Sequence, residues 1–113
     1  MRAIARLGQA SGMVWSQAME VTLCVLLWAR DGRDAELGRY EDQVLALLAD
    51  HGGRVVQRAR VEGGDGQPAE VQILRFDSDA ALDGYLNDPR RAALAGQRDA
   101  AIARTDVLRV ELL

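Results

Sequence analysis

Apolar side chains dominate both faces of the first regular segment, which runs from Glu20 to Ala29. In an extended strand, successive side chains point to opposite faces. The segment therefore presents two sets of residues, Val21, Leu23, Val25 and Leu27 on one face and Thr22, Cys24, Leu26 and Trp28 on the other. Because both sets are mostly apolar, the pattern predicts a central strand that is covered on both sides.

The next segment repeats apolar residues at steps of three and four, which is the period of an amphipathic helix. Its apolar stripe consists of Leu37, Tyr40, Val44, Leu47, Leu48 and His51. Asp34 is a good N-cap residue, and the pair Gly52-Gly53 is typical of a helix end. The pattern predicts a single helix from Ala35 to His51.

Two further strands and a hairpin are predicted in the middle of the chain. The segment Arg54–Glu62 alternates loosely and is strongly polar on one side, which favours a strand near an edge of the sheet. The glycine-rich residues 63–68 predict a hairpin loop, because they join two strands and open no helix. The return strand, Ala69–Phe76, places Val71 and Ile73 on one face and Leu74 and Phe76 on the other.

The last part of the chain predicts a helical region and a final strand. Ser78 lies among residues that cap a helix well, and Asp88-Pro89 is typical of a second helical start. The helical pattern continues to about Arg104. Residues Thr105–Leu113 then predict a strand with Leu108, Val110 and Leu112 on one face.

The predicted order is strand–helix–strand–strand–helix–strand, the arrangement of a split βαβ fold. The fold class is therefore α+β, a βαββαβ sandwich in which two helices cover one face of a four-stranded antiparallel sheet. The first strand is apolar on both faces, so the uncovered face predicts a homodimer formed through the sheet. Residues 1–19 interrupt their apolar positions with glycines and polar residues and are predicted to be an N-terminal extension, which leaves 20–113 as the domain.

Composition limits the function without selecting it. The chain has 113 residues, a net charge of −3 and fourteen basic residues that are all arginine, and this acidic balance argues against nucleic acid as a partner. No stretch reaches the roughly 18 apolar residues of a membrane helix, so no membrane association is expected. The one cysteine, Cys24, excludes an internal disulfide and favours the reducing cytoplasm.

The chain resembles the ferredoxin-like domains of the dimeric α/β-barrel superfamily, and within it small bacterial families of unknown function. The resemblance covers about 20–113 and rests on the strand order and on three segments. These segments are His51-Gly52-Gly53-Arg54, residues 71–78 leading into Ala80-Ala81-Leu82, and residues 85–91 followed by Arg98. It implies the same fold and a dimer. Because the superfamily includes cofactor-free monooxygenases, haem-handling enzymes, small-lactone isomerases and proteins without known activity, the resemblance does not select a function.

Three residues are candidates for catalysis. His51, the only histidine, could transfer a proton, or it could stabilise the end of its helix. Tyr40 lies on the helix face that should turn toward the sheet, where its hydroxyl needs a partner. Arg75 points where apolar groups are expected, so it is predicted to form an ion pair with Glu41 or Glu70, or to bind a carboxylate or enolate ligand.

Two aromatic residues are candidates for ligand binding. Trp28 could line a pocket, or pack in the core or in the dimer interface. Tyr85 lies on the second helix and is expected to face the sheet. The predicted site is therefore a pocket between sheet and helices, lined by Tyr40, His51, Arg75 and Tyr85.

Two functions remain open from the sequence. One is a small-molecule-binding domain or cofactor-independent enzyme, similar to a monooxygenase or an isomerase, that needs neither metal nor organic cofactor. The other is a non-catalytic accessory dimer with a filled core. An open cavity between sheet and helices would favour the first function.

Overall fold

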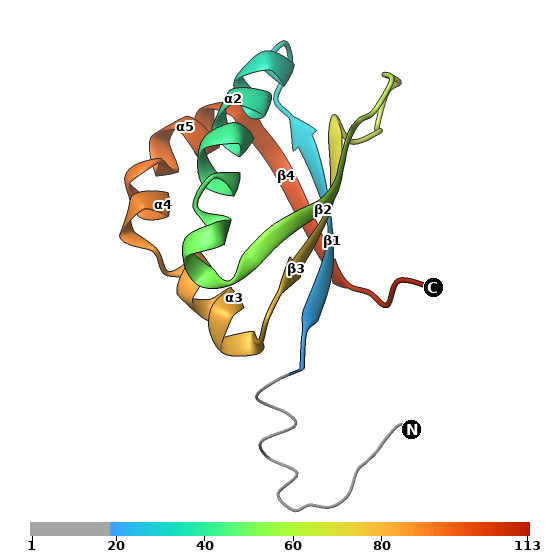
Figure 1. Cartoon of the computed structure of the whole chain (residues 1–113). Helices are drawn as coiled ribbons and strands as arrows, with labels where there is room; N and C mark the ends of the chain where they lie inside the picture. The colour runs from blue at the N-terminus through green and yellow to red at the C-terminus, as the bar shows by residue number, and fades with distance from the viewer. Residues whose placement is uncertain (1–18) are drawn as a thin grey trace, which may run out of the picture.

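A computed structural model describes residues 19–113 of the chain. Residues 1–18, which make up all but the last residue of the predicted extension, lie outside the described residues. The described part forms one sheet with a layer of helices on one side (Figure 1). None of its helices is long and apolar enough to cross a membrane.

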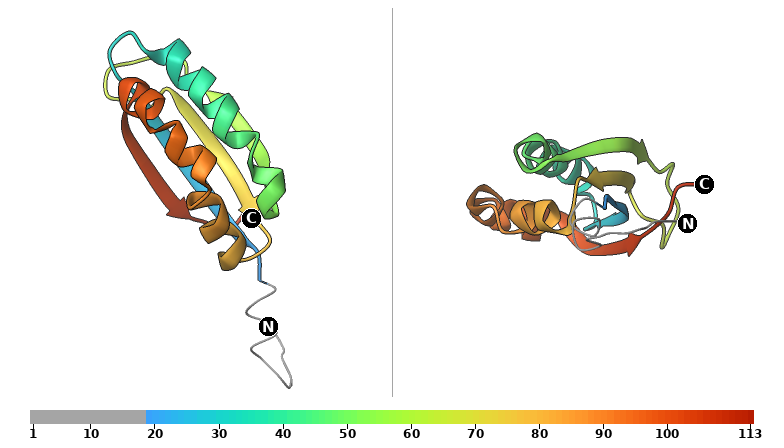
Figure 2. Two further views of the ribbon diagram at one scale, coloured as in Figure 1. Left: turned by 90° about the vertical axis from the view of Figure 1, so that its left-hand side faces the viewer. Right: turned by 60° about the horizontal axis from the view of Figure 1, so that its bottom comes forward.

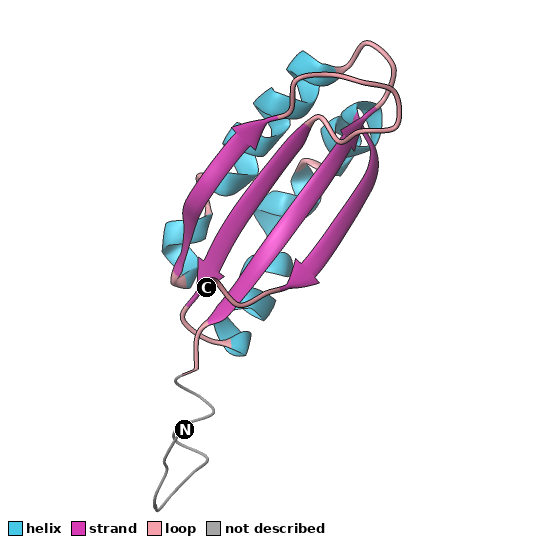
Figure 3. Ribbon diagram, turned by 90° about the vertical axis from the view of Figure 1, so that its right-hand side faces the viewer, coloured by secondary structure: helices cyan, strands magenta, loops and turns pink. Residues whose placement is uncertain are grey.

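The sheet contains β1 (Val21–Ala29), β2 (Gly53–Arg60), β3 (Glu70–Phe76) and β4 (Ile102–Arg109). The strand order is β2-β3-β1-β4, and every neighbouring pair is antiparallel (Figure 3). The predicted α+β class, the central position of β1 and the edge position of β2 are confirmed. Both central strands bury alternate residues, so β1 is covered on one face only by the described residues and its predicted second cover is not among them.

The helical layer contains α2 (Asp34–Leu45), the short 3-10 helix η1 (Leu48–His51), α3 (Asp79–Leu86), α4 (Pro89–Ala93) and α5 (Ala95–Ala101). Figure 2 shows α2 running beside the α3–α5 segment across the same face of the sheet. Ser78 caps α3 by accepting a hydrogen bond from the Ala81 amide, and Asp88 caps α4 in the same way from the Arg90 amide. Both caps agree with the predicted helix starts.

The predicted helix from Ala35 to His51 is wrong in its second half, because α2 ends at Leu45. The carbonyl of Val44 accepts a hydrogen bond from the Leu47 amide at 3.1 Å and another from the Tyr85 hydroxyl at 3.0 Å. A bond that spans three residues tightens the turn and stops the α-helical pattern. The chain then turns at Gly52, whose φ of 67° is the left-handed cap that glycine favours.

The boundary between the last helix and strand also differs from the prediction. Helix α5 ends at Ala101 and β4 begins at Ile102, three residues before the predicted start at Thr105. The Arg30 amide donates to the Ala101 carbonyl at 2.9 Å, and Ile102 pairs with Ala29 beside a bulge in β1. The strand ends at Arg109, short of the predicted Leu113, although the Val110 amide still donates to the Thr22 carbonyl at 3.0 Å.

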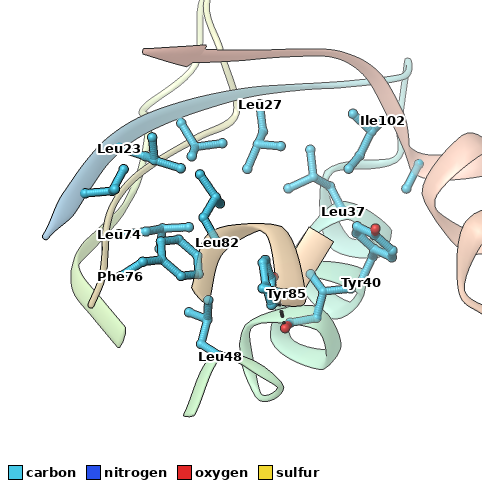
Figure 4. Packing of buried hydrophobic residues seen from close by; sticks show 14 residues of the cluster. Leu23, Leu27, Leu37, Tyr40, Leu48, Leu74, Phe76, Leu82, Tyr85 and Ile102 are labelled. Carbon is cyan, nitrogen blue, oxygen red and sulfur yellow. Dashed lines mark hydrogen bonds between the residues drawn. The ribbon is translucent and has the colours of Figure 1, made fainter. Parts of the chain in front are cut away.

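The core lies between the sheet and the helices (Figure 4). The sheet contributes Phe76 and Leu27, which are almost fully buried, and the helical layer contributes Leu37 and Leu48, which are equally buried. Burial of such side chains is the main favourable contribution to folding, at about 25 cal/mol for each Å² of apolar surface. The same layer contains polar groups, which define the candidate site.

The opposite face of the sheet has no covering element among the described residues (Figure 3). The registers place Leu26 beside Val71, and Cys24 between Ile73 and Leu108, on this face. Leu108 is 54% exposed. This uncovered apolar face is the feature from which the sequence predicts a homodimer.

Candidate functional site

A cavity of about 410 Å³ lies between the sheet and the helices. Its apolar wall comes from β1, β3 and the helices and includes Leu23, Leu27, Leu74 and Leu82, which Figure 4 shows around the same space. Its polar lining includes Tyr40, Glu41, Gln72, Tyr85, Arg91 and Thr105. A volume of this size, with few polar groups in an apolar wall, is typical of small-molecule sites.

The two tyrosines of the cavity differ in their hydrogen bonding. The Tyr85 hydroxyl donates to the Val44 carbonyl at 3.0 Å, and burial raises the pKa of Tyr85 to about 12. The Tyr40 hydroxyl has no hydrogen-bond partner among the described residues, although the side chain is only 3% exposed. Burial also raises the pKa of Tyr40. Tyr40 is therefore a neutral hydroxyl that is available to a ligand.

A buried carboxyl, Glu41, lines the cavity beside Tyr40 and is 6% exposed. The Gln72 side-chain amide donates to Glu41 Oε1 at 2.8 Å and to Glu70 Oε2 at 2.7 Å. Arg58 reaches Glu70 from the edge strand at 2.6 Å. Burial raises the pKa of Glu41, so its neutral form is favoured relative to an exposed glutamate. A carboxyl with a raised pKa that lines a cavity is a candidate for proton transfer to or from a bound molecule.

Two further polar groups of the lining are Arg91 and Thr105. The Arg91 guanidinium lies 4.5 Å from the centre of the Tyr85 ring and has no carboxylate partner among the described residues. The Thr105 hydroxyl oxygen is buried and has no hydrogen-bond partner within the described part of the chain. Because a buried hydroxyl without a partner is costly, Thr105 favours a bound molecule or water in the cavity.

His51 does not line the cavity, so its predicted place in the pocket is wrong. Its Nε2 lies 2.8 Å from Asp88 Oδ2, and its ring meets the Tyr85 ring edge-on. Hydrogen bonds from the Arg90 side chain and from His51 hold the pKa of Asp88 well below its usual range. His51 thus joins the end of η1 to the start of α4, which is close to the helix-end role considered for it.

Arg75 lies on the opposite face of the sheet, so it cannot join Tyr40 and Tyr85 in one pocket. The predicted pairing with Glu41 or Glu70 is wrong, because residues 70 and 75 are an odd number apart and point to opposite faces. Arg75 Nε instead donates to Thr22 Oγ1 at 3.2 Å and lies 3.9 Å from Glu20 Oε1. The ion pair exists, but with a half-exposed partner.

Trp28 also lies away from the cavity, on the uncovered face of the sheet. Its indole nitrogen donates to the Gly66 carbonyl at 3.0 Å, and the Arg104 guanidinium stacks 4.5 Å from the ring centre. The hairpin loop and β4 thus hold Trp28 in place. This position is outside the pocket, which was one of the roles considered for Trp28, and the dimer-interface role stays a prediction.

Comparison with known proteins identifies the fold through solved structures alone. No family model matches the chain, and no curated protein matches it either. A protein of unknown function from Rhodopseudomonas palustris superposes with a TM-score of 0.70 at 18% identity, covering 93% of this chain and 95% of that chain. A dimeric protein of unknown function with a ferredoxin-like fold, from Bacteroides fragilis, gives 0.65 at 15% identity, covering 82% and 96%.

The chain has the ferredoxin-like fold. The cofactor-independent oxygenase SnoaB from Streptomyces nogalater shares this fold with a TM-score of 0.62 at 19% identity, covering 83% of this chain and 95% of that chain. The resemblance to ferredoxin-like domains is thereby confirmed at the level of the fold. Similarity of this degree shows the fold and not the chemistry.

The cavity of this ferredoxin-like domain contains residues that the sequence reasoning did not propose for it, namely Glu41, Gln72, Arg91 and Thr105. A signal for two of them was present. Glu41 lies four residues after Leu37 and three before Val44, within the apolar stripe, and Gln72 alternates with Leu74 and Phe76. A polar residue at an apolar position of the pattern indicates a buried polar group.

Proposed function

We propose that this ferredoxin-like domain binds a small, largely apolar organic molecule in the cavity between sheet and helices and acts on it without a cofactor. The observation that carries the proposal is the cavity of about 410 Å³, which is lined by the buried Thr105 hydroxyl and by Tyr40, and neither hydroxyl has a hydrogen-bond partner among the described residues. A filled core, as an accessory dimer would have, would not leave such groups facing an open space.

The chemistry that the lining supports is proton transfer. Glu41 would accept a proton from an acidic C–H or phenolic O–H bond of the substrate, and the Tyr40 hydroxyl would donate a hydrogen bond to the resulting oxyanion. Return of that proton to a different carbon gives an isomer, so atoms balance without another reactant. In an oxygenase reaction, dioxygen would oxidise a substrate methylene to a carbonyl, with its second oxygen atom leaving as water.

The experiment is a binding and turnover screen of phenols and β-dicarbonyl compounds with the full chain. A ligand should raise the melting temperature of the wild type, and Tyr40→Phe and Glu41→Gln should each lower turnover at least tenfold. Val107, a cavity-lining residue on β4 that is 55% exposed, offers a blocking variant that needs no repacking of the core. Val107→Trp should abolish binding, whereas Arg39→Gln on the outer surface of α2 should leave it unchanged.

A screen in which no compound stabilises the wild type would contradict the proposal. So would compounds that bind Val107→Trp as well as the wild type, because binding would then lie outside the cavity. Either result would favour the accessory dimer.

The assembly that we propose is a homodimer joined through the uncovered sheet face. Leu26, Ile73 and Leu108 give this face its apolar character, and one similar structure is described as dimeric. A specific interface buries on the order of 1,200–2,000 Å² in total. The cavity lies on the other side of the sheet, so the dimer would leave the site accessible.

A further inference from the structure

A second, outer cleft of about 290 Å³ lies at the surface of the helical layer and shares part of its lining with the cavity. Four residues line both spaces, namely Tyr40, Leu86, Arg91 and Arg98. They come from α2, α3, α4 and α5, the segments that Figure 2 shows side by side. These four residues, one tyrosine, one leucine and two arginines, form the boundary between the cavity and the outer cleft.

Both arginines at this boundary are poorly neutralised. Arg91 has no carboxylate partner within the described residues, and its guanidinium is held over the Tyr85 ring. Arg98 has a contact with its neighbour Asp99 at 3.6 Å, and both side chains are exposed to solvent. An exposed ion pair of this kind contributes little and is readily exchanged for a better partner.

The acidic groups near the boundary do not offset these two charges. Asp88 lines the outer cleft, but its carboxylate is engaged by Arg90 and His51. Glu41 lies inside, and its Oε1 accepts a hydrogen bond from the Gln72 side-chain amide at 2.8 Å. The boundary is thus locally positive, although the chain as a whole has a net charge of −3.

We propose that the ligand of the cavity is an amphiphilic carboxylate, whose carboxylate group binds Arg91 and Arg98 at the entrance while its apolar body occupies the interior. The proposal rests on the proposed binding function and adds the chemical class of the ligand. Guanidinium groups recognise carboxylates through paired hydrogen bonds, and the leucine-rich wall suits an apolar body. The net negative charge of the chain disfavours ligands with several negative charges.

The test compares three probes that share one chain and differ in charge, namely decanoate, decanol and decylammonium, by calorimetric titration of the full chain. Decanoate should bind at least tenfold more tightly than decanol, and decylammonium more weakly than both. Arg91→Met and Arg98→Met should each weaken decanoate about tenfold and change decanol less than twofold. Arg39→Met is the matched control, because Arg39 is 67% exposed on α2 and should leave both affinities unchanged.

Two results separate failure of this inference from failure of the proposed function. If decanoate and decanol bind equally and the arginine variants have no effect, the proposal that the ligand is a carboxylate is wrong, but the cavity remains a binding site. Binding of no probe to the wild type, or binding that survives Val107→Trp, would overturn both. Circular dichroism of each variant at the titration temperature establishes that the variants are folded.

Discussion

Removal of the hydroxyl should destabilise the domain at one tyrosine of the cavity and leave its stability nearly unchanged at the other. Tyr85→Phe removes a buried hydroxyl that donates to the Val44 carbonyl at 3.0 Å. The ring contact with Phe76 does not involve the hydroxyl and remains. Loss of one such hydrogen bond costs about 0.5–1.5 kcal/mol of unfolding free energy. In a domain of this size, about 1 kcal/mol lowers the melting temperature by about 4–8 °C.

Tyr40→Phe removes a hydroxyl that has no partner among the described residues. The free energy of unfolding should therefore change by less than about 0.5 kcal/mol. A small increase would fit as well, because the buried side chain would lose a polar group that has no partner. Urea unfolding of the wild type and both variants, followed by circular dichroism, measures the difference directly. If Tyr40→Phe costs as much as Tyr85→Phe, the Tyr40 hydroxyl has a structural partner and is not available to a ligand.

Three further predictions follow from the charges and the uncovered face. Glu41→Gln should stabilise the domain relative to the wild type at about pH 8 and not at about pH 4. Burial raises the pKa of Glu41, so the stability that its protonated form gives the wild type is lost as the pH rises through that pKa. A stability difference that does not depend on pH would contradict this. Asp88→Asn should lower the melting temperature at neutral pH, and its difference from the wild type should shrink below about pH 3.8. The lowered pKa of Asp88 adds stability only while the carboxylate is charged. Thermal melts at neutral pH and below about pH 3.8 test this. Leu26→Glu should shift the chain toward monomer in sedimentation velocity at micromolar concentration, and a wild type that is already monomeric would refute the dimer.

The local patterns of the sequence predicted the order and faces of the strands well, because period-two burial is a local property. The alternation in β3 placed Val71 and Ile73 on one face and Leu74 and Phe76 on the other, as observed. The same alternation, applied to Arg75, should have separated it from Glu70. The error there came from expecting a charge to be paired inside the core, when its own strand face was the uncovered one.

The ends of elements were less predictable, because distant residues decide them. Helix α2 stops where Tyr85, forty-one residues away, donates to the Val44 carbonyl. The alanine-rich run before Ile102 suits a helix in isolation, but Ile102 pairs with Ala29 in the sheet. The candidate site shares this dependence on distant contacts. Tyr40 and Tyr85 reach one cavity as expected, whereas His51 is drawn to Asp88, for which the chain offers no local signal.

Gln72 limits the substitutions that this chain can accept during evolution. Its one side-chain nitrogen donates to carboxylates on two different elements, so the amide can take only one orientation. An apolar residue at position 72 would leave two buried acids facing each other, and a glutamate would add a third negative charge. Positions 41, 70 and 72 therefore form an epistatic unit, in which replacement of the central amide becomes tolerable only after one of the flanking acids has been lost. In an alignment of relatives, we expect these three positions to covary, with a non-amide at 72 accompanied by a neutral residue at 41 or 70.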